Sequence, residues 1–229
     1  MSRHPAFPHE VLAVVLQVRS DRLCVLLWRR GRAPFQDGWA LPGGSLGVDE
    51  RLGASVARHL AAKVDVSRLA HLEQLETRSD PDRDPRGREL ATAYLGLVPV
   101  DQEPQLPPDT EWHPIDVLPA TAFDHGSIVL AGRARLRAKL SYTSIGYALA
   151  APRFTIAELR RVYAASLGYE VSATNLQRVL LRRDLIVATA DTVAPGPSGG
   201  RPARRFRFVH RDVRVTDPFA AFRPPKVEG

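Results

Sequence analysis

The sequence predicts a protein of the α/β (α+β) class, in which an α/β/α sandwich at residues 1–147 is followed by a winged helix-turn-helix domain at residues 148–229. Short apolar runs alternate with amphipathic stretches in the first part. Two closely spaced helical patterns precede two strand patterns in the last part, which also holds the excess positive charge. With 229 residues, of which 44% are hydrophobic, the chain can build two ordinary cores.

The strands of the first domain are predicted from short apolar runs. Val11–Val18 and Leu23–Trp28 are nearly continuous apolar segments, typical of buried strands, and a tight turn at Ser20-Asp21 joins them. Further strands are expected at residues 39–41, 72–76 and 90–98.

Two helices are expected beside these strands. Leu52, Val56 and Leu60 form one apolar stripe on a helix that ends near Val64, and residues 124–140 alternate apolar and basic side chains as a helix does. Strands with helices outside them favour the sandwich. Between the expected strands at residues 72–76 and 90–98 lies a charged loop, residues 78–88, with two prolines and a glycine. Loops of this kind often carry functional residues.

A spaced motif begins at the glycine pair of residues 43–44. The motif consists of a glycine, five residues of any type, a glutamate, seven residues of any type, and then Arg-Glu-apolar-x-Glu-Glu-x-Gly-apolar. Five residues of the sequence match it: Gly44, Glu50, Arg58, Leu60 and Val66. This motif resembles the box of Nudix pyrophosphatases. Where it has three further glutamates the sequence has His59, Ala62 and Lys63, and Asp65 replaces its closing glycine.

The missing residues are those that would hold a metal. Positions 59, 62 and 63 share one face of a helix, where carboxylates would bind Mg²⁺. Histidine is a poor ligand for magnesium, alanine is none, and lysine repels it, so we expect no metal site and no catalytic residues. Lys63 instead contacts phosphates or lies on a solvated helix surface. The sequence thus predicts a Nudix-like domain that binds a ligand without cutting it.

Composition bounds the protein's environment. Cys24 is the only cysteine, so no intramolecular disulfide can form. The first ten residues have no apolar core of a signal peptide, and no apolar run approaches the roughly 18 residues that span a bilayer. We expect a cytoplasmic, nucleoid-associated protein without a membrane segment.

Charge separates the two parts of the chain. Residues 1–151 contain 18 basic and 18 acidic side chains, whereas residues 152–229 contain 14 basic and 7 acidic ones. A neutral domain followed by a basic one is expected when only the second binds a polyanion, although a solvated basic surface gives the same balance.

Local patterns in the basic part favour a DNA-binding domain. Thr155 and Glu158 have the spacing of a capping box, Gly168 ends that helix, and Ser172 can cap a second one. Strands are expected at residues 186–190 and 204–209, around a tip rich in glycine and proline at residues 195–202.

The second of these strands predicts a basic wing. Phe206 and Phe208 alternate with Arg205 and Arg207, so that the rings pack inward and the guanidinium groups face outward. The second helix would enter a major groove while the arginines contact phosphates. Solvent-facing positions are the alternative for single polar residues. The candidate DNA-binding residues are Thr155, Asn175, Gln177, Arg178, Arg182, Arg183, Arg201, Arg204 and Arg205.

Nearly the whole chain resembles the NrtR family, the Nudix-related transcriptional regulators of NAD metabolism. The resemblance rests on Pro34-Phe35 with residues 38–44, and on residues 82–88, 134–143, 154–163 and 200–203. It implies a homodimeric repressor that senses ADP-ribose or a related NAD metabolite. The repressor would bind a palindromic operator in double-stranded DNA upstream of NAD biosynthesis or salvage genes. No cofactor other than this nucleotide effector is expected.

The resemblance also suggests where the effector binds. Phe35 or Trp39 would stack on adenine, although Trp39 is equally well interpreted as a core aromatic residue. Arg58 would contact the ligand or pair with Glu50. The candidate ligand-binding residues are Phe35, Trp39, Gly43, Gly44, Arg58, Lys63, Arg83 and Arg86.

Two other functions remain open at this point. The protein could be a Mg²⁺-dependent hydrolase of ADP-ribose or another nucleoside diphosphate, using Glu50 with Glu73, Glu76 or Glu89. Alternatively, the C-terminal domain binds only protein. In the regulatory interpretation, ligand binding shifts the segment of residues 133–147 and so changes the spacing of two DNA-binding domains.

Overall fold

The computed structural model describes residues 6–63, 69–194 and 202–216, except for the side chain of Lys63. The chain divides into two compact units, Met1–Arg135 and Leu136–Gly229, and the division falls inside helix α2 (His125–Tyr142). Within the described ranges, no helix has the length and apolar character needed to cross a bilayer. Asp65, Val66 and Arg201, which the sequence motifs include, lie outside the described residues.

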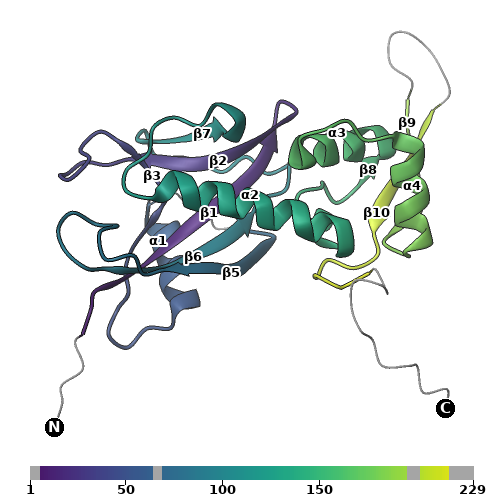
Figure 1. Ribbon diagram of the computed structural model, residues 1–229. Helices are drawn as coiled ribbons and strands as arrows, with labels where there is room; N and C mark the ends of the chain where they lie inside the picture. The colour runs from purple at the N-terminus through teal and green to yellow at the C-terminus, as the bar shows by residue number, and fades with distance from the viewer. Residues whose placement is uncertain (1–5, 64–68, 195–201, 217–229) are drawn as a thin grey trace, which may run out of the picture. The chain divides into compact units, whose positions relative to one another are not determined.

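The first unit is built on a mixed sheet whose main path runs β3-β2-β1-β6-β5, with β4 beside β1 and β7 beside β2 (Figure 1). Among the paired strands in the described ranges, β1 and β6 run parallel and the other pairs of this sheet are antiparallel. The strands are β1 (His9–Arg19), β2 (Arg22–Arg29), β3 (Trp39–Ala40), β4 (Gly43–Ser45), β5 (His71–Arg78), β6 (Leu90–Leu97) and β7 (Thr110–Pro114).

The predicted hairpin at the start of the chain is confirmed. Arg19 pairs with Arg22, which leaves Ser20 and Asp21 as a two-residue loop with φ of 46° and 58°. Positive φ at both central positions matches the right-handed twist of the two strands.

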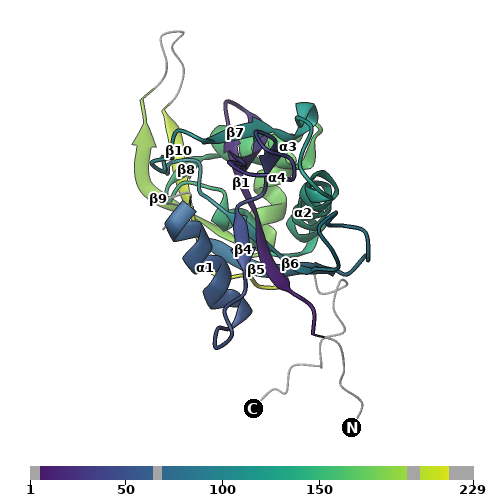
Figure 2. The same cartoon turned by 90° about the vertical axis from the view of Figure 1, so that its left-hand side faces the viewer.

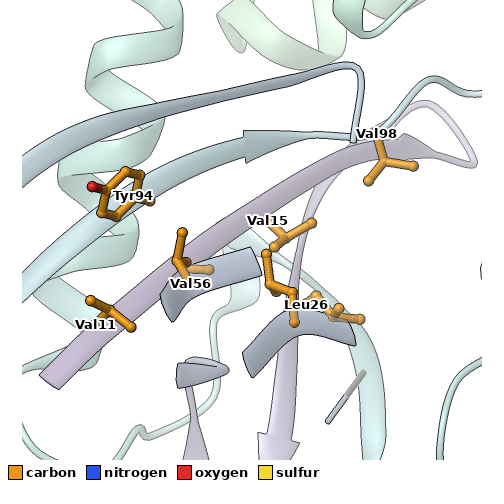
Figure 3. Close-up of a cluster of buried hydrophobic side chains, with 8 residues drawn as sticks. Val11, Val15, Leu26, Val56, Tyr94 and Val98 are labelled. Carbon is orange, nitrogen blue, oxygen red and sulfur yellow. The ribbon is translucent and has the colours of Figure 1, made fainter. Parts of the chain in front are cut away.

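Two helices cover opposite sides of β1 (Figure 2). Helix α1 (Leu52–Lys63) packs Val56 and Leu60 against Val11, Ala13 and Val15, in the cluster drawn in Figure 3. Alternate residues of a strand face opposite sides, so Val14 points toward α2. A Cβ atom on Gly132 of α2 would lie 2.7 Å from Val14 Cγ1, which shows how closely that helix approaches the sheet. The predicted sandwich is therefore confirmed.

Strand β7 was not predicted from the sequence. It forms an antiparallel pair with β2, opposite Cys24 to Trp28, and is followed by a short 3₁₀ helix at Ile115–Val117. Only the first of its five residues is buried, so the segment lacks the apolar pattern that indicates a strand.

The described part of the second unit contains the end of α2, two further α-helices, a 3₁₀ helix and a three-stranded sheet in the order β8-β10-β9. Its elements are a 3₁₀ helix (Ile145–Ala148), β8 (Phe154–Thr155), α3 (Ile156–Leu167), α4 (Ala173–Arg182), β9 (Ile186–Val193) and β10 (Ala203–Phe208). The expected capping box is present at Thr155 and Glu158, and Gly168 ends α3 with a left-handed φ of 77°. The winged helix-turn-helix prediction is confirmed.

Candidate functional site

The first unit holds a polar cavity of about 360 Å³. Its wall comes from the first half of β1, the end of β2, strand β4, the loop at residues 84–89 and the first residue of α2. Many side chains of this wall are charged: the basic residues are Arg30, Arg32, Arg86 and Arg88, and the acidic ones are Glu10, Asp84 and Glu89. Such a surface suits a ligand that carries negative groups among polar ones.

Gly43, Gly44 and Arg86 are the predicted ligand residues that line this cavity. Each glycine also has a packing reason. A Cβ atom on Gly43 would lie 2.1 Å from the Val11 carbonyl oxygen, and one on Gly44 would lie 2.4 Å from the His59 ring. Position 43 therefore requires glycine whether or not a ligand binds, because the added atom would meet backbone, whereas at position 44 the His59 ring would have to move.

Arg83 does not line the cavity. Its side chain is 1% exposed, and it donates to Glu10 Oε1 and to Asp124 Oδ1, each at 2.9 Å. Arg83 thus joins strand β1 to the residue before α2. Its charge is already balanced by two carboxylates, so the geometry favours a role in holding Glu10 and Asp124 in place.

Arg58 is also outside the cavity wall, and it pairs with Glu50, as one of the two sequence interpretations expects. Arg58 Nε donates to Glu50 Oε1 at 2.8 Å, and Nη2 donates to Oε2 at 2.7 Å. Hydrogen bonding to Arg58 lowers the pKa of Glu50 to about 2. Both oxygens of the remaining box carboxylate are thus bound by a cation of the protein itself.

The other box positions do not offer magnesium ligands. His59 Nε2 lies 3.0 Å from the Ser45 carbonyl oxygen, to which it donates, and Ala62 has no polar atom. The Lys63 side chain lies outside the description. Among the described residues, no group of three His, Cys, Asp or Glu side chains is arranged to hold a metal ion. The magnesium that Nudix hydrolases use therefore does not fit the residues present.

The aromatic residues predicted to stack on adenine are not among those that line the cavity. Trp39 packs edge-on against His113, with ring centroids 4.3 Å apart, and Arg29 lies over it at 4.7 Å. Phe35 contacts Phe123 at 4.8 Å. Trp28 lines the cavity instead, and its indole nitrogen donates to the Leu41 carbonyl.

Several cavity residues escaped the sequence analysis, among them Trp28, Arg30 and His125. Trp28 ends the apolar run of β2 and Arg30 follows it, so the change from apolar to basic residues at this point was the only signal. His125 had no signal, because it opens a helix and its hydrogen-bond partner, the Leu41 backbone N–H, lies 84 positions earlier in the chain.

The acidic residues of the cavity titrate differently. Asp84 is bound by Arg86, with Nη2 to Oδ2 at 2.5 Å, and this hydrogen bonding lowers the pKa of Asp84 to about 2. Burial, together with the charges of Glu10 and Asp84, raises the pKa of Glu89 to about 7. Glu89 therefore changes charge near neutral pH, while Asp84 stays ionised.

The sequence analysis named four glutamates as candidate metal ligands of a hydrolase, and among them Glu89 lines the cavity. Glu50 is occupied by Arg58. Glu73 and Glu76 lie on β5, where Glu73 contacts His71 at 3.1 Å and Glu76 contacts Arg78 at 2.6 Å. The structure does not bring these four carboxylates together.

Helix α4 offers one polar exposed side in the second unit. Asn175, Arg178 and Arg182 are exposed, while Leu176 and Leu180 are buried against the domain. Arg178 Nη2 donates to Asn175 Oδ1 at 2.8 Å, so these two side chains are held together. The inward and outward sides of the helix thus agree with the sequence interpretation.

Gln177 and Arg183 are half-buried, and Arg183 Nη1 donates to the Ser141 carbonyl at 2.8 Å. Thr155 is 8% exposed, and its hydroxyl takes part in the capping box of α3. These contacts lie within the second unit, so they favour structural roles for Thr155 and Arg183.

The strand pattern of the wing follows the expected alternation. Phe206 and Phe208 are both 5% exposed, whereas Arg204 and Arg207 are exposed and Arg205 is half-buried. A bulge between Arg204 and Phe206 shifts the pairing of β10 with β9. The wing therefore presents Arg204 and Arg207 to its surroundings.

Comparison with known families now places both units. Residues 7–131 match the NUDIX domain, and residues 146–208 match the NrtR DNA-binding winged helix domain. The chain is also 31% identical over 224 residues to the ADPR responsive transcriptional repressor NtrR of Acinetobacter baylyi, covering 93% of this chain and 87% of that relative.

The chain belongs to the NrtR family.

Solved NrtR structures show the same fold. Shewanella oneidensis NrtR complexed with a 27mer DNA is 29% identical, with a TM-score of 0.75 over 87% of this chain and 92% of that one. The NUDIX domain of the same protein complexed with ADP ribose is 35% identical, with a TM-score of 0.53 over 58% of this chain and 90% of that one. The resemblance to NrtR inferred from the sequence is thus confirmed over both domains.

Proposed function

We propose that this protein is a repressor of NAD biosynthesis or salvage genes, which binds DNA through its second domain and ADP-ribose or a related nucleotide through its first. The observation that carries the proposal is the likeness to an ADPR responsive repressor along 93% of the chain, across both domains. The cavity in the first unit and the exposed arginines of the second supply matching surfaces.

For DNA, the side of α4 that carries Asn175, Arg178 and Arg182 would enter the major groove. Asparagine and arginine are suited to base edges, and Arg204 and Arg207 of the wing to phosphates. The operator would be a palindrome bound by a homodimer, because two copies of one reading helix require two related half-sites.

For the effector, the cavity of about 360 Å³ falls within the roughly 300–1,000 Å³ typical of small-molecule sites. Its arginines would bind phosphate groups, and Trp28 offers a flat surface to a base or sugar. This assignment replaces Trp39 and Phe35 with Trp28 as the aromatic contact.

The same domain would bind its ligand without hydrolysing it and without a resident metal. Pyrophosphate cleavage in a Nudix site requires a cation that neutralises the diphosphate and activates water. The Glu50 carboxylate, which would hold it, is bound through both oxygens by Arg58.

Helix α2 would couple the two sites. This helix begins in the first unit with the cavity residue His125. It continues past Arg135, the last residue of that unit, and ends at Tyr142 in the second unit. A ligand that contacts the first turn of this helix can bias its position. For repression to be relieved, the ligand must bind the free protein more tightly than the DNA-bound protein.

A gel shift tests the proposal. The DNA is taken from upstream of the protein's own gene and of neighbouring NAD-biosynthesis genes, and the titration is repeated with ADP-ribose, NAD and ATP. We expect a specific shift that ADP-ribose or a related nucleotide alters. If operator affinity stays the same at saturating concentrations of every nucleotide, the proposed coupling between nucleotide binding and DNA binding is rejected. If the protein binds no DNA even at low salt, its proposed role as a DNA-binding regulator is rejected.

Incubation with Mg²⁺ and ADP-ribose tests the absence of hydrolysis. We expect no AMP or ribose 5-phosphate above the level of a blank, whereas turnover at roughly 1 s⁻¹ or faster is an ordinary enzyme rate and would restore the hydrolase.

A further inference from the structure

His125 presents a buried donor to the cavity. The Leu41 backbone N–H donates to His125 Nδ1 at 3.0 Å, so Nδ1 acts as the acceptor. Burial lowers the pKa of His125 to about 3, which keeps the ring neutral at physiological pH. The single ring proton therefore belongs to Nε2.

That Nε2–H group has no partner in the described part of the chain. His125 is 2% exposed and lines the cavity, yet its Nε2 atom makes no hydrogen bond with any described residue. A buried donor without an acceptor costs free energy, so such groups are normally satisfied by a ligand or by water.

Arg30 supplies a second donor of the same kind in the same cavity. It is 8% exposed, its Nε donates to the Pro34 carbonyl at 3.0 Å, and its Nη2 is buried without a hydrogen-bond partner among the described residues. None of the described ion pairs includes Arg30, in contrast to Arg83 and Arg86.

Phe123 fixes the relative placement of these groups. Its ring centroid lies 4.7 Å from the Arg30 guanidinium carbon and 5.3 Å from the His125 ring centroid. Arg86, which also lines the cavity, lies 5.7 Å from the same ring. The donors are thus packed against one aromatic side chain, which orients them before a ligand arrives.

The chemistry of these atoms selects the ligand group. Both unpartnered atoms are donors, one of them on a cation, so the complementary group presents acceptor oxygens with negative charge. A phosphate offers several such oxygens, and a neutral base or sugar does not carry the charge. Asp84 and Glu10, the acidic neighbours, are already bound by Arg86 and Arg83.

We infer that His125 Nε2 and Arg30 Nη2 form a two-donor site for the phosphate oxygens of a nucleoside diphosphate effector. This inference rests on the proposed function for the identity of the effector, and it adds the atoms that recognise its diphosphate.

Two substitutions of His125 separate ligand binding from packing. In His125→Asn, the amide oxygen can still accept from Leu41 N–H, but no donor reaches the position of Nε2. In His125→Gln, the amide nitrogen can replace the Nε2 donor, but the acceptor for Leu41 is lost. A residue that serves only to hold Leu41 would tolerate Asn better than Gln, and a ligand donor would show the reverse order.

Calorimetric titration of the full-length protein provides the measurement. We expect ADP-ribose affinity to fall about tenfold in His125→Asn and tenfold or more in Arg30→Met, and to stay within about threefold in His125→Gln. Adenosine, which lacks phosphate, should bind all variants equally. Arg22→Met, at an exposed ion pair with Asp116, serves as the control, and thermal unfolding shows that each variant is folded.

Several outcomes overturn the inference. These are unchanged ADP-ribose affinity in folded His125→Asn and Arg30→Met, equal losses for adenosine and ADP-ribose, or greater loss in Gln than in Asn. If the wild type does not bind ADP-ribose, the proposed effector fails, and AMP and inorganic diphosphate then test the site alone. If AMP or inorganic diphosphate binds the wild type and binds His125→Asn more weakly, the two-donor site is supported. If neither binds the wild type, the two-donor site is rejected.

Discussion

At the scale of single residues, Arg83 shows how a charged motif residue can serve the fold. The sequence predicts a ligand-binding arginine in a loop, but the side chain is buried between Glu10 and Asp124. Three segments distant in sequence meet at this one guanidinium group. No local pattern reveals that both partners are carboxylates of the same domain, so only the structure separates Arg83 from Arg86.

Removing Arg83 should destabilise the first domain. Arg83→Ala leaves two largely buried carboxylates without a cation, and breaking a buried ion pair in this way costs about 3 kcal/mol. Urea unfolding monitored by tryptophan fluorescence measures the loss. Arg22→Ala, which breaks an exposed pair with Asp116, should cost less than about 1 kcal/mol. Similar losses in the two variants would show that the buried pairs contribute nothing special.

Glu89 should make effector binding depend on pH. Its pKa is raised to about 7, so it is mainly neutral at pH 6 and mainly ionised at pH 8. Glu10, Asp84 and Arg86 face it, and Asp84, with a pKa of about 2, keeps its charge across this range. An anionic diphosphate is repelled by ionised Glu89, so affinity is expected to be about fivefold higher at pH 6 than at pH 8.

Titration of ADP-ribose at both pH values tests this expectation, with Glu89→Gln as the neutral control. The variant should bind with nearly the same affinity at pH 6 and pH 8. Tighter binding of the wild type at pH 8 would contradict the sign of the effect and would indicate a ligand that brings positive charge to Glu89.

The sign for stability follows from the same shift. The pKa of Glu89 in the folded protein lies above the ordinary value of 4.5, so the folded state binds this proton more tightly than the unfolded state. Its contribution to stability is complete below about pH 4.5 and is lost as the pH rises through about 7.

At the scale of elements, the sequence predicts what depends on neighbouring residues. The hairpin turn at Ser20-Asp21, the capping box at Thr155 and the apolar stripe of α1 are local patterns, and all three are present. Strand β7 depends on pairing with β2, and the cavity gathers residues from five separate segments. Such long-range contacts leave no periodic signal, so Trp28, Arg30 and His125 could not be identified as neighbours.

The capping box of α3 provides a test of the role of Thr155. Its hydroxyl accepts from the Glu158 backbone N–H, while the Glu158 carboxylate accepts from the Thr155 backbone N–H. Thr155→Ala should therefore destabilise the second domain by about 1 kcal/mol, and Thr155→Ser should keep most of the stability. Circular dichroism during urea unfolding measures both variants.

DNA affinity separates this structural role from a DNA contact. Under conditions in which both variants are fully folded, operator binding should be the same for Thr155→Ala and the wild type. A weaker gel shift for folded Thr155→Ala would restore Thr155 to the DNA-binding surface, as the sequence had predicted.

At the scale of the whole molecule, charge and ligand chemistry divide between two domains. The first 151 residues are balanced at 18 basic and 18 acidic side chains, and the remaining part carries the excess. Sequence therefore predicts which domain meets DNA, but not which of its arginines are available. The structure separates exposed Arg178, Arg182 and Arg204 from Arg183, which is used within its own domain.

This division predicts how salt affects operator binding. Phosphate contacts release condensed counterions, so the logarithm of affinity should fall linearly with the logarithm of salt concentration. Arg204 lies exposed on the wing, and a homodimer would bring two copies of it to the phosphates. Arg204→Ala should therefore weaken binding to all sequences alike and reduce the salt slope by about 2. Fluorescence anisotropy between 50 and 200 mM salt, roughly the range over which such slopes are resolved, measures it.

The comparison with Arg178→Ala and Arg22→Ala completes this test. Arg178 projects from α4 beside Asn175, so its removal should reduce the preference for the operator over unrelated DNA by about 1–3 kcal/mol. Arg22, in the neutral first domain, should change neither the slope nor the preference. If Arg22→Ala lowers the slope as much as Arg204→Ala does, the charge that binds DNA is not confined to the second domain, and the division of labour between the two domains is wrong.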